Sequence, residues 1–184
     1  MESEHLEGEL YKVLPAINTA GSDSAMLDNT LEFMVMNGME LPLAVMVTIP
    51  EPWENNHSMD PKKRAFYQYY ATMLEPWDGP ASILFSDGDV MGAVLDRNGL
   101  RPARYLITNN DMMVVASEVG VMDFEPGEIK EKGRLQPGKI LMIDTEQGKI
   151  YYDGELKEQL ASARPYRAWL SANRIELDTL KSGR

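Results

Sequence analysis

The sequence of 184 residues contains no cysteine and only two histidines. Without cysteine, the chain can form no disulfide, no thiolate metal site and no iron–sulfur ligation, and it has no cysteine nucleophile. One of the two histidines, His57, lies in the polar stretch Trp53 to His57, which is typical of a loop. We therefore expect no catalytic histidine and no metal site in this chain.

The chain is also short of positive charge and of long apolar runs. Its 18 lysines and arginines stand against 29 aspartates and glutamates, a net charge of −11, which disfavours binding to phosphate backbones and anionic lipids. The longest mainly apolar stretch, Leu41 to Pro50, is much shorter than the ~20 residues of a membrane-spanning helix. Residues 1–10 are acidic, unlike a signal peptide. We expect a cytoplasmic protein that binds neither nucleic acid nor membrane.

The first part of the chain carries helix signals, and no flexible linker divides the sequence. Apolar residues recur at helical spacing after a serine-rich start and predict a helix from about Ser24 to Asn37. A second helix is predicted to begin at Asp60-Pro61 and to end before Pro76. The short apolar run from Pro42 to Ile49 fits either a helix or a strand. One continuous domain is the simplest interpretation.

From Pro80 onward, short β-rich runs alternate with turn residues. This pattern predicts three antiparallel hairpins in series, followed by a helix. The hairpins pair 82–85 with 90–95, 104–108 with 112–117, and 139–144 with 149–153, and the helix covers 154–163. We therefore predict an α+β fold in which helices flank antiparallel sheets.

Two short motifs have both a chemical and a structural interpretation. Asp87 and Asp89 have the spacing that opens a calcium loop, but the twelfth position is Asn98 rather than glutamate, so a tight turn at Asp87-Gly88 is favoured. Arg97, Arg101 and Arg104 lie within eight residues. They could bind an acidic ligand or hold acidic loops of the protein itself, and we favour the second role.

Seven collinear sequence strings resemble the class II glutamine amidotransferase domain of glutamate synthase large subunits, in the N-terminal-nucleophile hydrolase superfamily. Together the strings span nearly the whole chain, and those that contain tryptophan are the most specific to glutamate synthase. They are GSDSAMLDNTLEFMVMNG from Gly21, IPEPWENN from Ile49, MDPKKRAFYQYY from Met59, EPWDGPA from Glu75, DGDVMGAVLDRNGLRPARY from Asp87, ASEVGV from Ala116 and KGRLQPGKILMIDT from Lys132.

The resemblance implies a four-layer αββα sandwich and a role in glutamate biosynthesis. In this family an N-terminal cysteine attacks the side-chain amide of glutamine, and the ammonia passes to an FMN site, where 2-oxoglutarate is converted to glutamate. By the resemblance, Asp23 matches the aspartate that receives the α-ammonium group of glutamine. The interpretation from the residues alone is that Asp23 caps a helix. FMN and an iron–sulfur cluster are expected in other domains of the parent chain, with a small NADPH-binding subunit as a further partner.

The sequence departs from the family pattern at its catalytic parts. Residue 2 is Glu2 rather than cysteine, and nothing before Gly21 matches the family's oxyanion asparagine–glycine pair or its carboxylate-binding arginine. We expect residues 1–184 to be the C-terminal part of the amidotransferase domain, inactive alone because the nucleophile segment is missing. The alternative is a non-catalytic acidic binding module with an amidotransferase-like fold. The electron donor of the parent, NADPH, NADH or ferredoxin, stays open.

Overall fold

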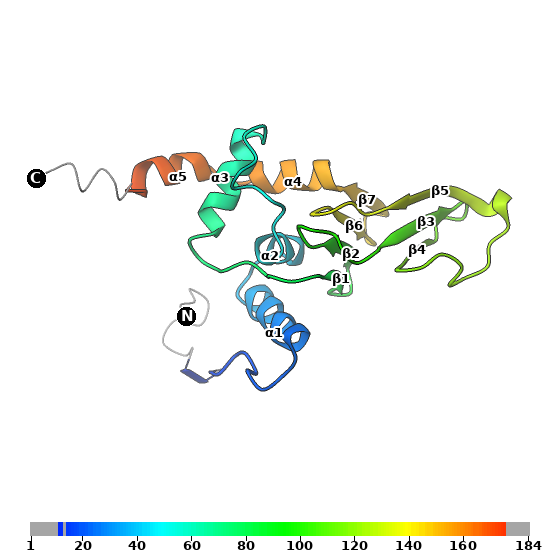
Figure 1. Ribbon diagram of the computed structural model, residues 1–184, viewed down its shortest axis with the longest axis horizontal. Helices are drawn as coiled ribbons and strands as arrows, with labels where there is room; N and C mark the ends of the chain where they lie inside the picture. The colour runs from blue at the N-terminus through cyan, green and yellow to red at the C-terminus, as the bar shows by residue number, and fades with distance from the viewer. Residues whose placement is uncertain (1–10, 13, 176–184) are drawn as a thin grey trace, which may run out of the picture.

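The computed structural model describes residues 11–12 and 14–175, which form helices and antiparallel strands (Figure 1). No helix within these described ranges is long and apolar enough to cross a membrane. In chain order the elements are α1 (Asp23–Met36), α2 (Leu41–Thr48), α3 (Pro61–Tyr70), β1 (Ser82–Ser86), β2 (Val90–Leu95), β3 (Arg104–Thr108), β4 (Met113–Ala116), the short 3₁₀ helix η2 (Pro126–Glu128), β5 (Ile129–Arg134), β6 (Ile140–Asp144), β7 (Lys149–Tyr152), α4 (Asp153–Ser162) and α5 (Tyr166–Asn173).

The two helices predicted most clearly from the sequence are α1 and α3. The side chain of Ser22 caps α1 by accepting a hydrogen bond from the backbone N–H of Ala25, and Asp60 caps α3 in the same way. However, α3 ends at Tyr70, followed by a turn, so the expected continuation toward Pro76 is wrong. The capping residues therefore located the starts of these helices better than apolar spacing located the end of α3.

The undecided run from Pro42 to Ile49 is mostly the helix α2. Seven of the eight residues of α2 are buried, all except Leu43, so the run has no polar face from which its period could be recognised. Its one local helix signal is Pro42 in the first turn.

All three predicted hairpins form, but they do not make one sheet. The hairpins β1–β2 and β6–β7 join through β2 and β6 into a four-stranded sheet, in the order β1-β2-β6-β7. The hairpin β3–β4 belongs to a separate three-stranded sheet, in the order β4-β3-β5. Its third strand, β5, was not predicted, because its sequence IKEKGR alternates charged residues with few apolar ones. The expected α+β class with antiparallel sheets is confirmed.

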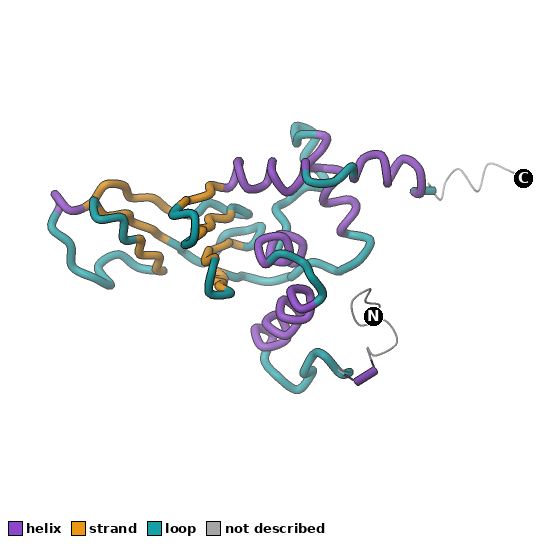
Figure 2. The backbone as a smooth tube through the Cα atoms, turned by 180° about the vertical axis from the view of Figure 1, so that it is seen from behind, coloured by secondary structure: helices purple, strands orange, loops and turns teal. Residues whose placement is uncertain are grey.

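Both faces of the four-stranded sheet carry buried apolar side chains, but Leu84 and Met91, on the face away from the helices, are 61% and 45% exposed. One face packs against the helices, and the other packs against the three-stranded sheet, which extends toward the end of the molecule away from the helices (Figures 1 and 2). Alternate residues of β2 divide between the two sides, since Val94 belongs to the helix-side core and Leu95 to the core between the sheets. The described residues thus supply a helix layer and two sheet layers.

An aromatic cluster joins α3 to α5, a helix that the sequence did not reveal. Phe66 is fully buried, and its ring meets that of Tyr166 edge-on at 5.4 Å between centroids. Tyr166 and Trp169 of α5 also contact Tyr69, and the hydroxyls of Tyr70 and Tyr166 lie 3.3 Å apart. These contacts fix α5 against α3 by side-chain packing.

We predict that Phe66→Ala destabilises the fold by about 3–5 kcal/mol, because the substitution removes a buried ring and leaves a cavity between α3 and α5. The free energy of unfolding in urea measures this loss. Met73→Ala is the matched control, since Met73 follows the same helix but is 58% exposed. Equal losses from the two substitutions would contradict the proposed role of the cluster.

Candidate functional site

The predicted substrate-binding residue, Asp23, is the first residue of α1. Ser22 is the N-cap of that helix, and the side chain of Asp23 is exposed, with no hydrogen bond or ion pair to any described residue. The structural interpretation, in which Asp23 caps the helix, is therefore wrong. A carboxylate in the first turn is favoured by the partial positive charge of the helix start, and here it stays accessible to a cation from outside.

A groove of about 700 Å³ runs between α1 and the edge strand β1, and its lining on α1 starts at Ser24, the residue after Asp23. Ser24 lines one end, Leu27 and Leu31 form its apolar wall, and residues 82–87 form the opposite side. A groove of this volume has the size of a small-molecule site. It brings the sequence string that starts at Gly21 next to the strand β1.

Three charged side chains form a buried cluster that the sequence did not predict. Lys157 of α4 is only 3% exposed, and its ammonium group lies 3.1 Å from Oε1 of Glu51 and 2.6 Å from Oδ1 of Asp153. It also donates a hydrogen bond of 2.7 Å to the backbone carbonyl of Gly138. The ammonium group thus has three oxygen partners, which offset the cost of removing it from water.

Two more lysines and a tyrosine complete this cluster. Lys63 lies 3.0 Å from Oε1 of Glu51, and Lys139 lies 2.8 Å from Oδ2 of Asp153. The hydroxyl of Tyr67 donates a hydrogen bond to Glu51. We call Glu51, Lys63, Tyr67, Lys139, Asp153 and Lys157 the charged cluster.

The pKa values of the two acids show which effect dominates in the charged cluster. Burial alone would favour the neutral carboxyl, but Lys157 and Lys63 outweigh it and hold the pKa of Glu51 below its ordinary value. Burial also opposes ionisation of Asp153, whose pKa is lowered by Lys157 and Lys139. For the buried ammonium group burial dominates, and the pKa of Lys157 is lowered despite Asp153 and Glu51. Both acids are therefore ionised at neutral pH.

The three arginines of residues 97–104 differ in their contacts. Arg97 pairs with Asp78 at 2.6 Å, and Arg101 donates to the backbone carbonyl of Pro80 at 3.2 Å, so both hold the 78–80 loop as favoured. The side chain of Arg104 makes no hydrogen bond or ion pair with any described residue. The buried Asp96 accepts hydrogen bonds from three backbone N–H groups and orders this segment.

The remaining sequence candidates have structural roles or none. The side chain of Asp87 accepts hydrogen bonds from the backbone N–H groups of Asp89 and Val90, and Gly88 adopts a φ of +105°, as a tight turn requires. His57 is exposed in a loop before α3. Across residues 11–12 and 14–175, no three acidic or histidine side chains gather as metal ligands would. His5 lies outside the described residues.

Strings far apart in the sequence meet around the charged cluster. Glu51 comes from IPEPWENN, Lys63 from MDPKKRAFYQYY and Lys139 from KGRLQPGKILMIDT. Arg64 donates hydrogen bonds to backbone carbonyls of the loop that follows Glu51. Gly138 approaches so closely that a Cβ atom there would lie 3.0 Å from the Cβ of Glu51. These strings are therefore parts of one folded unit.

Comparison with known proteins identifies this unit. The family model of the class II glutamine amidotransferases matches residues 1–169 of the sequence. The chain belongs to this family. It is 48% identical over 176 residues to the glutamate synthase [NADPH] large chain of Bacillus subtilis, and 46% identical over 181 residues to the glutamate synthase [NADH] of Schizosaccharomyces pombe. It is also 44% identical over 168 residues to the ferredoxin-dependent glutamate synthase of Cyanidium caldarium.

The family resemblance seen in the sequence is thus confirmed, but the relatives are much longer than this chain. The matches cover 96%, 98% and 90% of the chain, and only 12%, 9% and 11% of those three relatives. The chain therefore spans about a tenth of the length of these relatives. The names of these three relatives specify three different electron donors, NADPH, NADH and ferredoxin. Membership of this family therefore does not determine an electron donor.

We predict that Glu51→Gln destabilises the fold by about 3 kcal/mol near neutral pH, because it removes one partner of a buried ion pair. The pKa of Glu51 is lowered by folding, so its contribution is fully present above the ordinary carboxyl pKa of about 4 and is lost as pH falls through the lowered value. The stability gap between wild type and variant should therefore shrink in acid. Urea unfolding at several pH values measures it.

Glu54→Gln is the matched control, since Glu54 is an exposed glutamate three residues further along the same loop. We expect it to change stability by less than about 0.5 kcal/mol. A gap for Glu51→Gln that did not change with pH would mean that its charge is not what stabilises the cluster.

Proposed function

We propose that residues 1–184 form part of the glutamine-hydrolysing domain of a glutamate synthase large chain. In this proposal, the parent enzyme hydrolyses glutamine to glutamate and ammonia and delivers the ammonia to 2-oxoglutarate. The observation that carries the proposal is the carboxylate of Asp23, which lies in the family string at the start of α1, is exposed and does not cap the helix. It is supported by the match of the amidotransferase family over residues 1–169.

Asp23 would bind the α-ammonium group of glutamine. Its carboxylate does not cap the helix, because the side chain of Ser22 accepts the capping hydrogen bond from the backbone N–H of Ala25. An ammonium–carboxylate contact of this kind is a charge-assisted hydrogen bond, which is shorter and stronger than a neutral one. The groove between α1 and β1 would give the rest of the ligand an apolar wall at Leu27 and Leu31.

The nucleophile of the proposed reaction has to come from another part of the parent. Amide hydrolysis of this type needs a thiolate, a base and an oxyanion hole, and this chain contains no cysteine. Asp23 therefore acts as a binding residue, while a separate segment supplies the attacking sulfur. By itself the 184-residue chain would be inactive. The alternative is a free-standing, non-catalytic acidic binding module with an amidotransferase-like fold, which would also be inactive.

The redox groups of the parent are also proposed to lie outside this chain. Iron–sulfur clusters are held by cysteine thiolates, which this sequence does not offer. FMN and the cluster would be carried by other domains, and the electrons would come from NADPH through a small subunit, from NADH, or from ferredoxin. The contribution of this chain is limited to glutamine binding.

We predict that the 184-residue chain releases no ammonia from glutamine, because it has no thiol to attack the amide. Ammonia release in a coupled assay is the measurement, with a parent polypeptide that includes its N-terminal cysteine as the positive control. Glutaminase activity of the short chain would contradict the proposed division of roles.

We predict that Asp23→Asn in such a parent lowers kcat/KM for glutamine by about tenfold to hundredfold, because a charge-assisted contact to the substrate contributes about 1.5–3 kcal/mol. The reaction with free ammonia as nitrogen source should be unaffected. Glu40→Gln is the matched control, since Glu40 is an exposed acid at the start of the neighbouring helix α2 that makes no capping hydrogen bond. An unchanged kcat/KM in Asp23→Asn would overturn the role of Asp23.

A further inference from the structure

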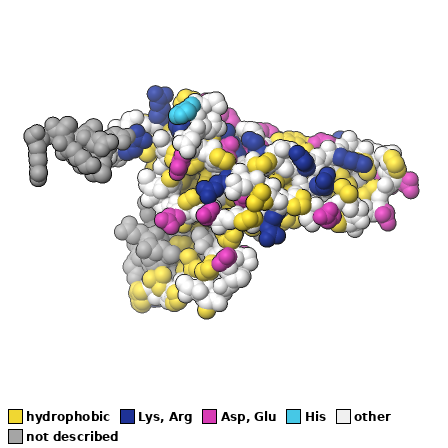
Figure 3. Space-filling model, viewed as in Figure 1, with side chains coloured by type: hydrophobic (Ala, Val, Ile, Leu, Met, Phe, Trp, Pro, Cys, Tyr) yellow, Lys and Arg dark blue, Asp and Glu magenta, His cyan; other side chains and the backbone are white. Residues whose placement is uncertain are grey.

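One face of the three-stranded sheet carries a concentration of positive charge in an otherwise acidic chain. Side chains alternate along β5, and Lys130, Lys132 and Arg134 all lie on its exposed face. Arg104 of β3 is exposed and pairs directly with Arg134 across the strands. Figure 3 shows lysine and arginine side chains gathered over this end of the molecule.

Three of these four cations are not neutralised within the described part of the chain. Lys130 pairs with Asp111 at 3.3 Å. Arg104, Lys132 and Arg134 make no ion pair or side-chain hydrogen bond with any described residue. Like charges directly opposite each other on neighbouring strands are destabilising, so the Arg104–Arg134 pair costs stability unless an anion from outside binds there. We call Arg104, Lys132 and Arg134 the cationic triad.

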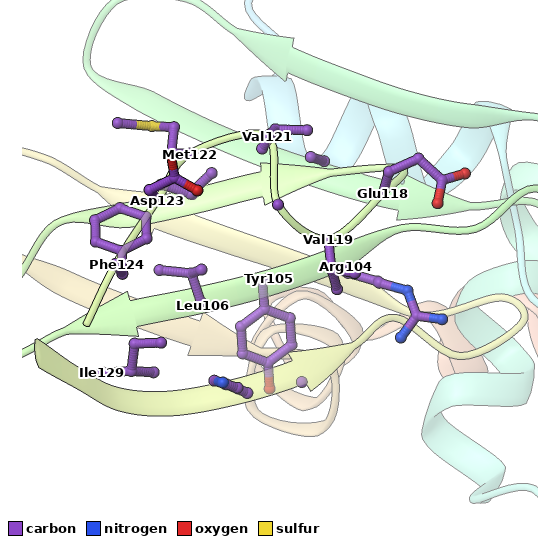
Figure 4. A pocket seen from close by; sticks show the side chains of 15 residues that line it. Arg104, Tyr105, Leu106, Glu118, Val119, Val121, Met122, Asp123, Phe124 and Ile129 are labelled. Atoms are coloured by element: carbon purple, nitrogen blue, oxygen red, sulfur yellow. The ribbon is translucent and has the colours of Figure 1, made fainter. Parts of the chain in front are cut away.

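An open apolar groove of about 350 Å³ adjoins the cationic triad. Leu106 and Val114 of the sheet line it, and so do residues 118–124 of the loop 117–125 that follows β4. Figure 4 shows Met122 and Phe124 at one end of the groove, with Val119 and Arg104 toward the other end. The loop also exposes large apolar side chains, since Val119 is 76% and Val121 is 55% exposed. Such an apolar surface beside unpaired cations is typical of an interaction site.

The spacing of the charges matches an extended polypeptide. Lys132 and Arg134 are two residues apart on one strand, which separates them by about 7 Å, the same distance as alternate side chains of another extended chain. Carboxylates at alternate positions of such a chain can therefore meet both cations at once. The relatives are also far longer than this chain, which covers only 12% of the B. subtilis protein, so the domain has extensive polypeptide surface to meet.

We propose that the cationic triad and the adjoining groove bind an extended acidic segment of polypeptide. Two alternate carboxylates of the segment pair with the cationic triad, and an apolar side chain two residues further along enters the groove beneath loop 117–125. This surface lies on the three-stranded sheet, whereas Asp23 lies at the start of α1, so the proposal does not depend on the proposed glutamine site.

The test uses the 184-residue chain and a fluorescein-labelled peptide built from the repeat Glu-Ser-Glu-Ser-Leu, with binding followed by fluorescence anisotropy. We expect saturable binding that weakens with added salt. The double variant Lys132→Glu/Arg134→Glu should weaken it at least about tenfold, the loss expected when about 1.4 kcal/mol of charge-assisted contact is removed. Arg167→Glu/Lys62→Glu is the matched control, since it makes the same charge change at exposed positions on α5 and α3.

Two comparison peptides separate the parts of the proposal. A peptide with lysine in place of glutamate should not bind, and one with serine in place of leucine should bind several-fold more weakly. Urea unfolding of both double variants is the control measurement that tests whether the fold is retained. Equal weakening by the control variant, equal affinity for the peptide without leucine, or no binding of the Glu-Ser-Glu-Ser-Leu peptide would each overturn the proposal.

Discussion

The buried ion pair between Glu51 and Lys157 connects parts of the chain that lie more than a hundred residues apart. Glu51 lies in the loop after α2, and Lys157 lies on α4. Each charge is buried only because the charged cluster supplies it with partners, since an isolated ion in the interior costs several kcal/mol. The loop after α2, the helix α4 and the turn at Gly138 are therefore fixed together.

This constraint joins three of the seven strings that resemble the family. Lys63 and Lys139 enter the charged cluster from two of the strings, and Arg64 holds the loop of a third. Residues that participate in one network cannot change independently, because loss of one partner leaves a buried charge unpaired. The tryptophan-containing string beginning at Ile49 is thus kept in place by electrostatics as well as by packing.

Local signals predicted the parts of the fold that depend on neighbouring residues. Ser22 and Asp60 located the starts of α1 and α3, and turn residues such as Asp87-Gly88 located the hairpins. The strand β5 was missed because its inward face carries few apolar residues. Glu131 on that face accepts a hydrogen bond from Tyr105, whose ring lies against Gly133, so tertiary contacts replace the usual apolar pattern.

The class of fold, the family and the absence of a thiol nucleophile in the chain could be predicted from the sequence, because each depends on residue types and their local spacing. The division of the hairpins between two sheets and the burial of Lys157 between two carboxylates were visible only in the folded structure. The structure also shows that Arg104 lies opposite Arg134 on the neighbouring strand, whereas Arg97 and Arg101 contact the 78–80 loop. These outcomes depend on strand register and on contacts between distant residues, which no short stretch of sequence contains.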